Sequence, residues 1–301
     1  MTRSPVRSIC VRSILVMAAL AALAAPAAAQ RDFSAVEIKT HKVAGSIYML
    51  EGPGGNIGVS AGPDGILIVD DQFKPLAEKI RAALKGINPG ALRFILNTHY
   101  HGDHVGGNEI FGTEGTIIAH DNVRKRVSTR QVSSGGTTEP LAKEGWPVIT
   151  FDTSVSIHFN GEEIRVLHVP AGHTDGDSVI FFTGANVVHM GDQMFAARFP
   201  YIDLEGGGTL EGYTKNIADI IARLPADVKV IPGHGPLSTL DDLKAIHRML
   251  VETAETVGGK IKQGKNLETI VAEGLPGYES WNWSFISTKR WIETLHEELS
   301  R

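Results

Sequence analysis

Residues 97–108 read NTHYHGDHVGGN and directly follow the largely apolar segment LRFIL at residues 92–96. This stretch places His99, His101, Asp103 and His104 within six residues of one another. The preceding segment is typical of a buried strand, and α/β folds usually place their functional sites beyond the carboxyl ends of strands. We therefore expect these side chains at one edge of a sheet, either as metal ligands or as part of a histidine-rich surface loop.

The spacing within the motif favours metal ligation. In an extended segment, alternate residues point the same way, so His99 and His101 can address one point. Asp103 and His104 are adjacent and must point to different sides, so one short loop can serve two neighbouring metal centres. Gly102, Gly106 and Gly107 permit the tight backbone that such a loop needs.

Further ligands for two metals appear at the ends of later predicted strands. His173 lies in PAGHTDGD after IRVLHVP, Asp192 lies in HMGDQ after NVVHM, and His234 lies in PGHG after VKVI. Each follows an apolar segment and has glycine close by, which is not the pattern of a random histidine-rich surface. We expect all three to converge with the first motif on one edge of the fold.

The rest of the chain alternates predicted strands and helices in two similar halves. The segment GPDGILIVDD at residues 62–71 resembles TGANVVHMGD at residues 183–192, each with a turn, an apolar strand and a terminal acid. Helices are predicted at residues 75–84 and 209–224, and the C-terminal region is mostly helical. Residues 133–147 predict a polar surface loop. Arg124, Lys125 and Arg126 are expected on a solvated helix face, and Asp70 and Asp71 are candidates to support the metal ligands.

Taken in order, THYHGDH, AGHT, GD and PGHG resemble the motifs of the metallo-β-lactamase superfamily of binuclear metallohydrolases. The resemblance covers nearly all of the chain after its N-terminal segment. It implies an α/β (α+β) fold, a four-layer αββα sandwich of two similar halves with the metal site at one edge of the sheets. By the same resemblance His99, His101 and His173 bind the first metal, Asp103, His104 and His234 bind the second, and Asp192 bridges them.

Imidazole and carboxylate ligands without thiolates suit Zn²⁺, two ions per chain, with Fe or Mn as alternatives. Two such ions would share a water and lower its pKa toward neutrality, giving a hydroxide that attacks a carbonyl. Asp103 is the expected catalytic residue, because it would orient this nucleophile or relay its proton to the leaving group.

The substrate is less determined by the sequence. Predicted export, the NTHYH and GGN sequences and the glycine-rich EGPGGN turn at residues 51–56 resemble secreted zinc β-lactamases, which implies a cyclic amide or ester as substrate. The familiar zinc β-lactamases, however, have cysteine where Asp192 stands and lysine where Phe195 stands. Arg198 is a candidate replacement for that lysine. The proposed pocket wall comprises Trp146, Phe195, Arg198, Phe199 and Tyr201.

Other functions remain open at this point. The bridging aspartate resembles the glyoxalase II-like thioesterase, lactonase and phosphodiesterase branches of the same fold. In a different class, the chain could be a periplasmic zinc-binding protein without catalysis. A full set of predicted ligands favours an enzyme, a zinc metallohydrolase, over this alternative.

The first residues predict export rather than part of the fold. Basic residues precede an apolar run at residues 14–25, and Ala27–Ala29 resembles a signal-peptidase site. We therefore predict a Sec-type signal peptide at residues 1–29, a hydrolase domain at residues 30–301, and a periplasmic or secreted protein. The chain's only cysteine, Cys10, lies in the predicted signal, so no disulfide or thiolate metal site is expected afterwards.

The charge balance limits the expected partners. Without the three signal arginines the chain has 26 basic and 34 acidic residues, a formal net charge of -8. A nucleic-acid partner would call for a basic stripe, so none is expected. We predict a small-molecule substrate and no membrane association after signal cleavage.

Overall fold

The computed structural model describes Met1 and residues 32–301, of which Ala35–Arg301 form one compact unit. The predicted signal peptide lies outside the described residues. No helix within the described part of the chain is long and apolar enough to cross a membrane.

The first sheet has seven strands and contains the opening motif's strand. All five residues of β4 (Gly65–Val69) are buried, as expected for an apolar strand covered on both faces. The strand order is β1 (Lys39–Ala44), β2 (Ile47–Glu51), β3 (Ile57–Gly62), β4, β5 (Leu92–Leu96), β6 (Thr116–His120) and β9 (Ile149–Phe151). From β4 to β9 the neighbours run parallel, so their carboxyl ends reach the same edge.

The second sheet has six strands from the second half of the chain. Its order is β10 (Ser154–Phe159), β11 (Glu162–His168), β12 (Ser178–Phe182), β13 (Val187–His189), β14 (Lys229–Ile231) and β15 (Ser238–Thr239). Strands β13 and β14 pair in parallel, with His189 opposite Ile231. The loops that follow these two strands therefore leave the sheet side by side.

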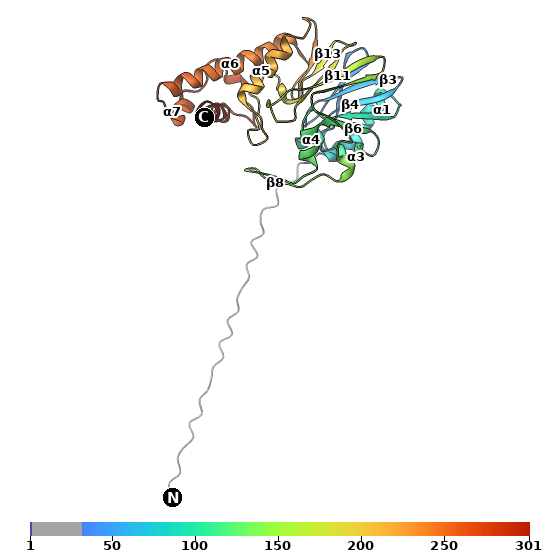
Figure 1. Ribbon diagram of the computed structural model, residues 1–301, viewed down its shortest axis with the longest axis horizontal. Helices are drawn as coiled ribbons and strands as arrows, with labels where there is room; N and C mark the ends of the chain where they lie inside the picture. The colour runs from blue at the N-terminus through green and yellow to red at the C-terminus, as the bar shows by residue number, and fades with distance from the viewer. Residues whose placement is uncertain (2–31) are drawn as a thin grey trace. The chain divides into compact units, whose positions relative to one another are not determined.

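The two sheets pack face to face, with helices outside each of them (Figure 1). The core between the sheets joins Leu67, Val69 and Leu96 from the first to Val166 and Ile180 from the second. The predicted four-layer sandwich is therefore confirmed. The helices beside the first sheet are α1 (Ala77–Ile87), α2 (Gly102–Val105), α3 (Asn108–Phe111) and α4 (Asp121–Val127). The helices beside the second sheet and after it are α5 (Leu210–Ile221), α6 (Leu240–Lys262), α7 (Leu267–Glu273) and α8 (Thr288–Leu299).

Helix α5 shows how closely local sequence determines an element. Its buried positions include Tyr213, Ile217 and Ile220, which recur at helical spacing, and the Thr209 hydroxyl caps its start by accepting from the Gly212 N–H at 3.0 Å. The helix ends at Ile221 rather than at the predicted Leu224.

Two local predictions were wrong. Part of the predicted loop at residues 133–147 pairs instead, as the hairpin of β7 (Gln131–Ser133) and β8 (Gly136–Thr138). Arg126 does not lie on a solvated face: it donates two hydrogen bonds to Asp175, at 2.8 and 2.7 Å, and lies 4.7 Å from the ring centre of Tyr100. The hairpin is a short local pairing, whereas the position of Arg126 depends on Asp175, 49 residues later, which local periodicity does not reveal.

Candidate metal centre

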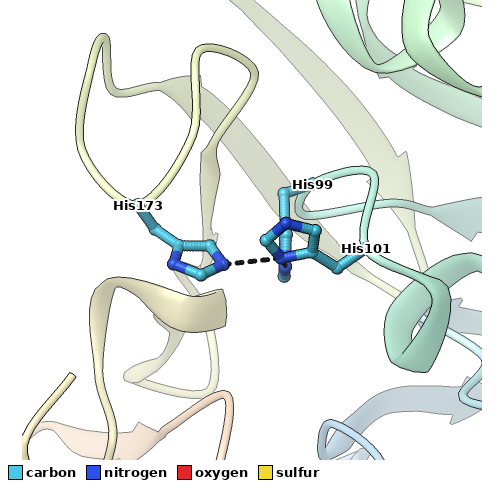
Figure 2. A group of neighbouring side chains, drawn as sticks. All are labelled: His99, His101 and His173. Atoms are coloured by element: carbon cyan, nitrogen blue, oxygen red, sulfur yellow. Dashed lines mark hydrogen bonds between the residues drawn. The ribbon is translucent and has the colours of Figure 1, made fainter. Parts of the chain in front are cut away.

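Three histidines meet at the edge of the two sheets. His99 and His101 follow β5, and His173 lies in the loop after β11 (Figure 2). Nε2 of His173 lies 2.9 Å from Nδ1 of His101, which lies 3.1 Å from Nε2 of His99. One ring nitrogen from each histidine therefore faces a common point, as the coordination of one ion requires.

The other ring nitrogen of each histidine is already engaged. Nδ1 of His173 donates to the Tyr201 carbonyl at 2.7 Å, and Nε2 of His101 donates to Asp203 at 2.9 Å. The Thr98 hydroxyl donates to Asp70 at 2.7 Å, so it accepts from Nδ1 of His99 at 3.0 Å. With these N–H groups engaged, a set of three neutral imidazoles would have only lone pairs facing one another, because a neutral imidazole has one N–H. That arrangement is repulsive without a cation between them, which is why these residues fit a metal ion.

A second group of ligand atoms lies beside the first. His104 lies on α2, and its Nε2 faces Asp192 Oδ1 at 3.2 Å and Nε2 of His234 at 3.4 Å. Asp103 Oδ2 lies 3.4 Å from the same His234 nitrogen. Asp192 Oδ2 lies 3.4 Å from His234 and 3.5 Å from His173, so this carboxylate faces both groups. The structure thus brings all seven predicted ligands together in two adjacent sets.

Burial and the two carboxylates determine how these groups are charged. Burial lowers the pKa of His173 to about 4 and holds that of His99 well below its ordinary value, so both are neutral at pH 7. Burial opposes protonation of His234 too, but Asp192 and Asp103 raise its pKa to about 9. In Asp192, burial favours the acid form, yet His234 and His104 hold its pKa well below the ordinary value. A buried anion surrounded by histidines is a good partner for a metal cation.

Asp192 supplies a further observation that fits a cation. Its Oδ1 is buried and, although His104 Nε2 lies 3.2 Å away, it accepts no hydrogen bond from the described residues. A buried carboxylate oxygen without a donor is costly, since desolvation removes the water that would satisfy it. A metal ion at this position would satisfy it.

Glycines allow the loops to approach the ligands closely. A Cβ on Gly233 would lie 2.0 Å from Asp192 Oδ1, and one on Gly55 would lie 2.2 Å from the His104 ring. Asn56 then joins the β2–β3 turn to the His234 loop by donating to the carbonyls of Pro232 and Gly235, at 2.9 and 2.8 Å. The loops that carry Gly55 and Gly233 therefore pack directly against His104 and Asp192, and neither glycine position has room for a larger side chain.

Two carboxylates support the ligands from behind. Asp70 faces Nδ1 of His104 at 2.8 Å and accepts from the Thr98 N–H at 2.7 Å, so its predicted supporting position is confirmed. The Asp71 carboxylate accepts from the Gly107 N–H at 2.8 Å, its backbone N–H donates to the His104 carbonyl at 2.8 Å, and burial raises the pKa of this carboxyl well above its ordinary value. Both acids therefore contact His104, the first through its carboxylate and the second through its backbone N–H.

Asp203 is a supporting residue that the sequence prediction missed. It accepts from His101 Nε2 at 2.9 Å, from the Tyr100 hydroxyl at 2.5 Å and from the Gly206 N–H at 2.8 Å. Burial would raise its pKa, but the hydrogen bonds from His101 and Tyr100 hold that pKa well below the ordinary value. Only the glycine run at residues 206–208 marks this segment in the sequence, and no predicted strand precedes it.

The predicted pocket wall divides into two groups. Phe195 stacks on the His234 ring at 5.1 Å between centres, and Tyr201 lies 5.9 Å from His101, so both border the ligands. Arg198 lies over Trp283, at 5.2 Å from its ring centre, in a segment that the sequence prediction did not select.

The other two wall predictions find different surroundings. Trp146 packs with the small cluster of Val105, Val123 and Val127, and its indole N–H donates to the Leu141 carbonyl at 2.8 Å. Phe199 is fully buried in the core under α5, α6 and α8. In both cases packing explains the residue, and no described contact joins either ring to the histidines.

Comparison with known proteins agrees with this geometry. A family model described as the metallo-beta-lactamase superfamily matches residues 42–234. A hydroxyacylglutathione hydrolase of Nitrosococcus oceani is 30% identical over 143 residues, which are 46% of this chain and 47% of that relative. The chain therefore spans about half the length of this curated relative.

Solved structures share the fold at low identity. The DIM-1 metallo-beta-lactamase superposes with a TM-score of 0.60 at 19% identity, over 73% of this chain and 99% of that one. A double mutant of the sec-alkyl sulfatase PisA1 gives a TM-score of 0.64 at 14% identity, over 86% of this chain and 50% of that one. Because the family model matches well over half of the sequence, the chain belongs to the metallo-beta-lactamase superfamily.

Proposed function

We propose that the chain is a dinuclear zinc hydrolase that attacks the carbonyl carbon of a cyclic amide or ester. The observation that carries the proposal is the convergence of seven ligand residues into two sets that share the Asp192 carboxylate. His99, His101 and His173 would hold one ion. The second would be held by Asp103, His104 and His234.

When bound, the two ions would supply Lewis acidity, polarising the scissile carbonyl and acidifying a water. The chain's own residues position the reactants. Asp103 is the most exposed carboxylate of the set, with 31% of its side chain accessible against 5% for Asp192. Burial works against its ionisation, but His104 and His234 hold its pKa below the ordinary value, so it is an anion at neutral pH. It is therefore suited to accept a hydrogen bond from the attacking water and to orient it.

A thioester is the second candidate substrate. The bridging position carries a carboxylate, Asp192, rather than the cysteine of familiar zinc β-lactamases, and one curated relative is a hydroxyacylglutathione hydrolase. Thioesters and lactams present similar carbonyl electrophiles, so the same site supports either. An assay of substrate preference distinguishes the two candidate substrates, whereas the geometry of the metal ligands does not.

The test is a metal count followed by a substrate panel. Protein reconstituted with zinc should hold two ions per chain and turn over at least one of a β-lactam, a lactone, a phosphodiester and a hydroxyacyl thioester of glutathione. Fewer than one ion per chain would refute the dinuclear site. Full loading without any turnover would favour a zinc-binding protein that does not catalyse.

Replacing the orienting carboxylate gives a sharper check. Asp103→Ala should lower kcat by about a hundredfold or more while the chain stays folded, since general acid–base and orienting groups contribute on that order. Asp241→Ala is the matched control, because this acid is 89% exposed on α6 and pairs only with Lys244 among the described residues. Equal activity of the two variants would rule out the role of Asp103.

We further propose that the protein is exported to the periplasm by residues 1–29. The support is the basic start, the apolar run at residues 14–25 and the small residues Ala27–Ala29. Mass spectrometry of the protein from a periplasmic extract should find Gln30 as the first residue. Recovery of the uncut chain from the cytoplasm alone would contradict export.

A further inference from the structure

Four aromatic side chains, Phe195, Tyr201, Trp283 and Phe285, form a continuous aromatic wall that begins at the candidate metal centre. Phe195 stacks nearly parallel on the His234 ring, at 5.1 Å and 14°. Tyr201 lies 5.9 Å from His101 and 5.7 Å from His173. The wall therefore touches ligands of both proposed ions.

The wall continues away from the ligands into solvent. Trp283 lies 5.9 Å from Phe195 and 5.6 Å from Phe285, and Phe285 lies 5.4 Å from Tyr201. The Trp283 indole N–H donates to the Phe199 carbonyl at 3.0 Å, which fixes the ring. Phe285 is 47% exposed, although an aromatic side chain of this size is usually covered. The outer end of the wall thus offers apolar surface beside the site.

Two guanidinium groups lie on this wall. Arg290, from α8, lies 4.6 Å from the Phe285 ring centre and 5.4 Å from that of Tyr201, while Arg198 lies over Trp283. Within residues 32–301 neither arginine forms an ion pair with a carboxylate. Asp203 and Glu205, the two acids whose charges act on Tyr201, bind other groups: Asp203 accepts from Tyr100 and His101, and Glu205 accepts from Ser134. Arg290 donates one hydrogen bond, from Nη1 to the Phe285 carbonyl at 3.1 Å, but among these residues no carboxylate neutralises either arginine, so both charges can pair with an anion.

We propose that the aromatic wall, Arg290 and Arg198 bind the part of the substrate remote from the scissile bond, and that this part is a flat apolar group carrying a carboxylate. The inference rests on the proposed hydrolase function and adds its substrate class. A guanidinium pairs with a carboxylate through two parallel hydrogen bonds, and a guanidinium stacked on a ring needs little reordering to do so. Trp283, Phe285 and Arg290 lie beyond the family-matched residues 42–234, so the C-terminal region supplies half of the six binding residues.

The test measures binding of molecules that have no scissile bond. Zinc-loaded full-length protein is titrated calorimetrically with 3-phenylpropanoate and with its neutral analogue 3-phenylpropan-1-ol. Arg290→Gln should weaken acid binding roughly tenfold, as expected for loss of one charge-assisted hydrogen-bonded pair, and should leave alcohol binding unchanged. Phe285→Leu should weaken both ligands alike, because it removes apolar surface rather than charge.

Matched variants make the outcome decisive. Arg93→Gln makes the same charge change at an exposed position on β5 that forms no contact with the wall, and should bind both ligands normally. Arg198→Gln is an independent second variant if Arg290→Gln proves unstable. If zinc alone held the carboxylate, neither arginine variant would change acid binding, and the proposal would be wrong. Absence of turnover on every panel compound would instead refute the hydrolase proposal and leave this titration result standing.

Discussion

Replacing Asp203 by Asn should selectively weaken the three-histidine site. Asp203 does not reach the common point of the three histidines; it accepts the Nε2–H of His101 and so leaves Nδ1 of that ring as the ligand atom. Asn keeps the shape but removes the charge. A carboxylate behind a metal-bound histidine fixes the tautomer and makes the ring a stronger ligand, so its loss should appear in metal affinity rather than in folding.

The magnitude follows from the hydrogen bonds that Asp203 accepts. A hydrogen bond to a charged acceptor contributes about 1.5–3 kcal/mol and a neutral one about 0.5–1.5 kcal/mol, so the exchange costs about 1–1.5 kcal/mol. Asn also has one oxygen with two lone pairs to serve His101, Tyr100 and Gly206, so one donor loses its partner. Because about 1.4 kcal/mol corresponds to a tenfold change, the exchange alone should lower zinc affinity about tenfold, and the unpaired donor extends the expected loss to roughly 10- to 100-fold.

The assay is a competition titration with a chromophoric chelator, which resolves the two zinc dissociation constants at fixed pH. Tyr100→Phe removes one donor but leaves the His101–Asp203 contact, so its effect should be several-fold smaller. Glu205→Gln is the matched control, since this exposed acid, two residues away, contacts Ser134 instead. If Asp203→Asn and Glu205→Gln hold the first zinc equally well, Asp203 does not position His101.

Two further predictions follow from other parts of the fold. Burial lowers the pKa of His168, so its contribution to stability is present above pH 6.5 and is lost as pH falls below that value. In denaturant unfolding from pH 7 to 5, His168→Gln should therefore reduce the loss of stability with falling pH, by at most about 1.4 kcal/mol per pH unit for one proton. Gly233→Ala would place its Cβ 2.0 Å from Asp192 Oδ1, so the zinc content measured by atomic absorption should fall below two ions per chain. Gly259→Ala is the control: its Cβ would have no neighbour within 4 Å, so this variant should keep both ions and stabilise α6 by about 0.5–1 kcal/mol. An unchanged zinc count in the Gly233 variant would contradict the close packing described for the bridging carboxylate.

The seven candidate ligands could be predicted because each follows a buried strand, and a buried strand is recognisable in the sequence as an apolar segment. His99, Asp192 and His234 come after β5, β13 and β14, whose residues are mostly apolar and mostly buried. Parallel neighbours deliver their carboxyl ends to one edge, so position along the chain is enough to infer convergence. The predicted strands and the predicted ligands therefore depend on the same feature, the shared edge at which parallel strands end.

Asp203 and the aromatic wall obey no such local rule. Asp203 lies in a segment without regular structure, and its importance comes from Tyr100 and His101, about a hundred residues earlier. Trp283 contacts Phe195 although helices α5, α6 and α7 lie between the two residues along the chain. Conversely, Trp146 follows a polar loop, as a pocket residue would, but its side chain packs against α4. The role of an aromatic residue depends on the residues that pack against it, and these residues can lie far away in the sequence.

The division of ligands between the sheets has a consequence for the candidate centre. The loop after β5 supplies two residues to each set, whereas His173, Asp192 and His234 all come from loops of the second sheet. Neither half therefore holds a complete set, and both sets form only when the two sheets pack. This packing places ring nitrogens of His99 and His173 at 3.1 and 2.9 Å from Nδ1 of His101 and buries an Asp192 oxygen that accepts no hydrogen bond from the described residues. Ions that relieve these costs would bind the folded chain more tightly than the unfolded one, so ion binding and sheet packing would stabilise each other.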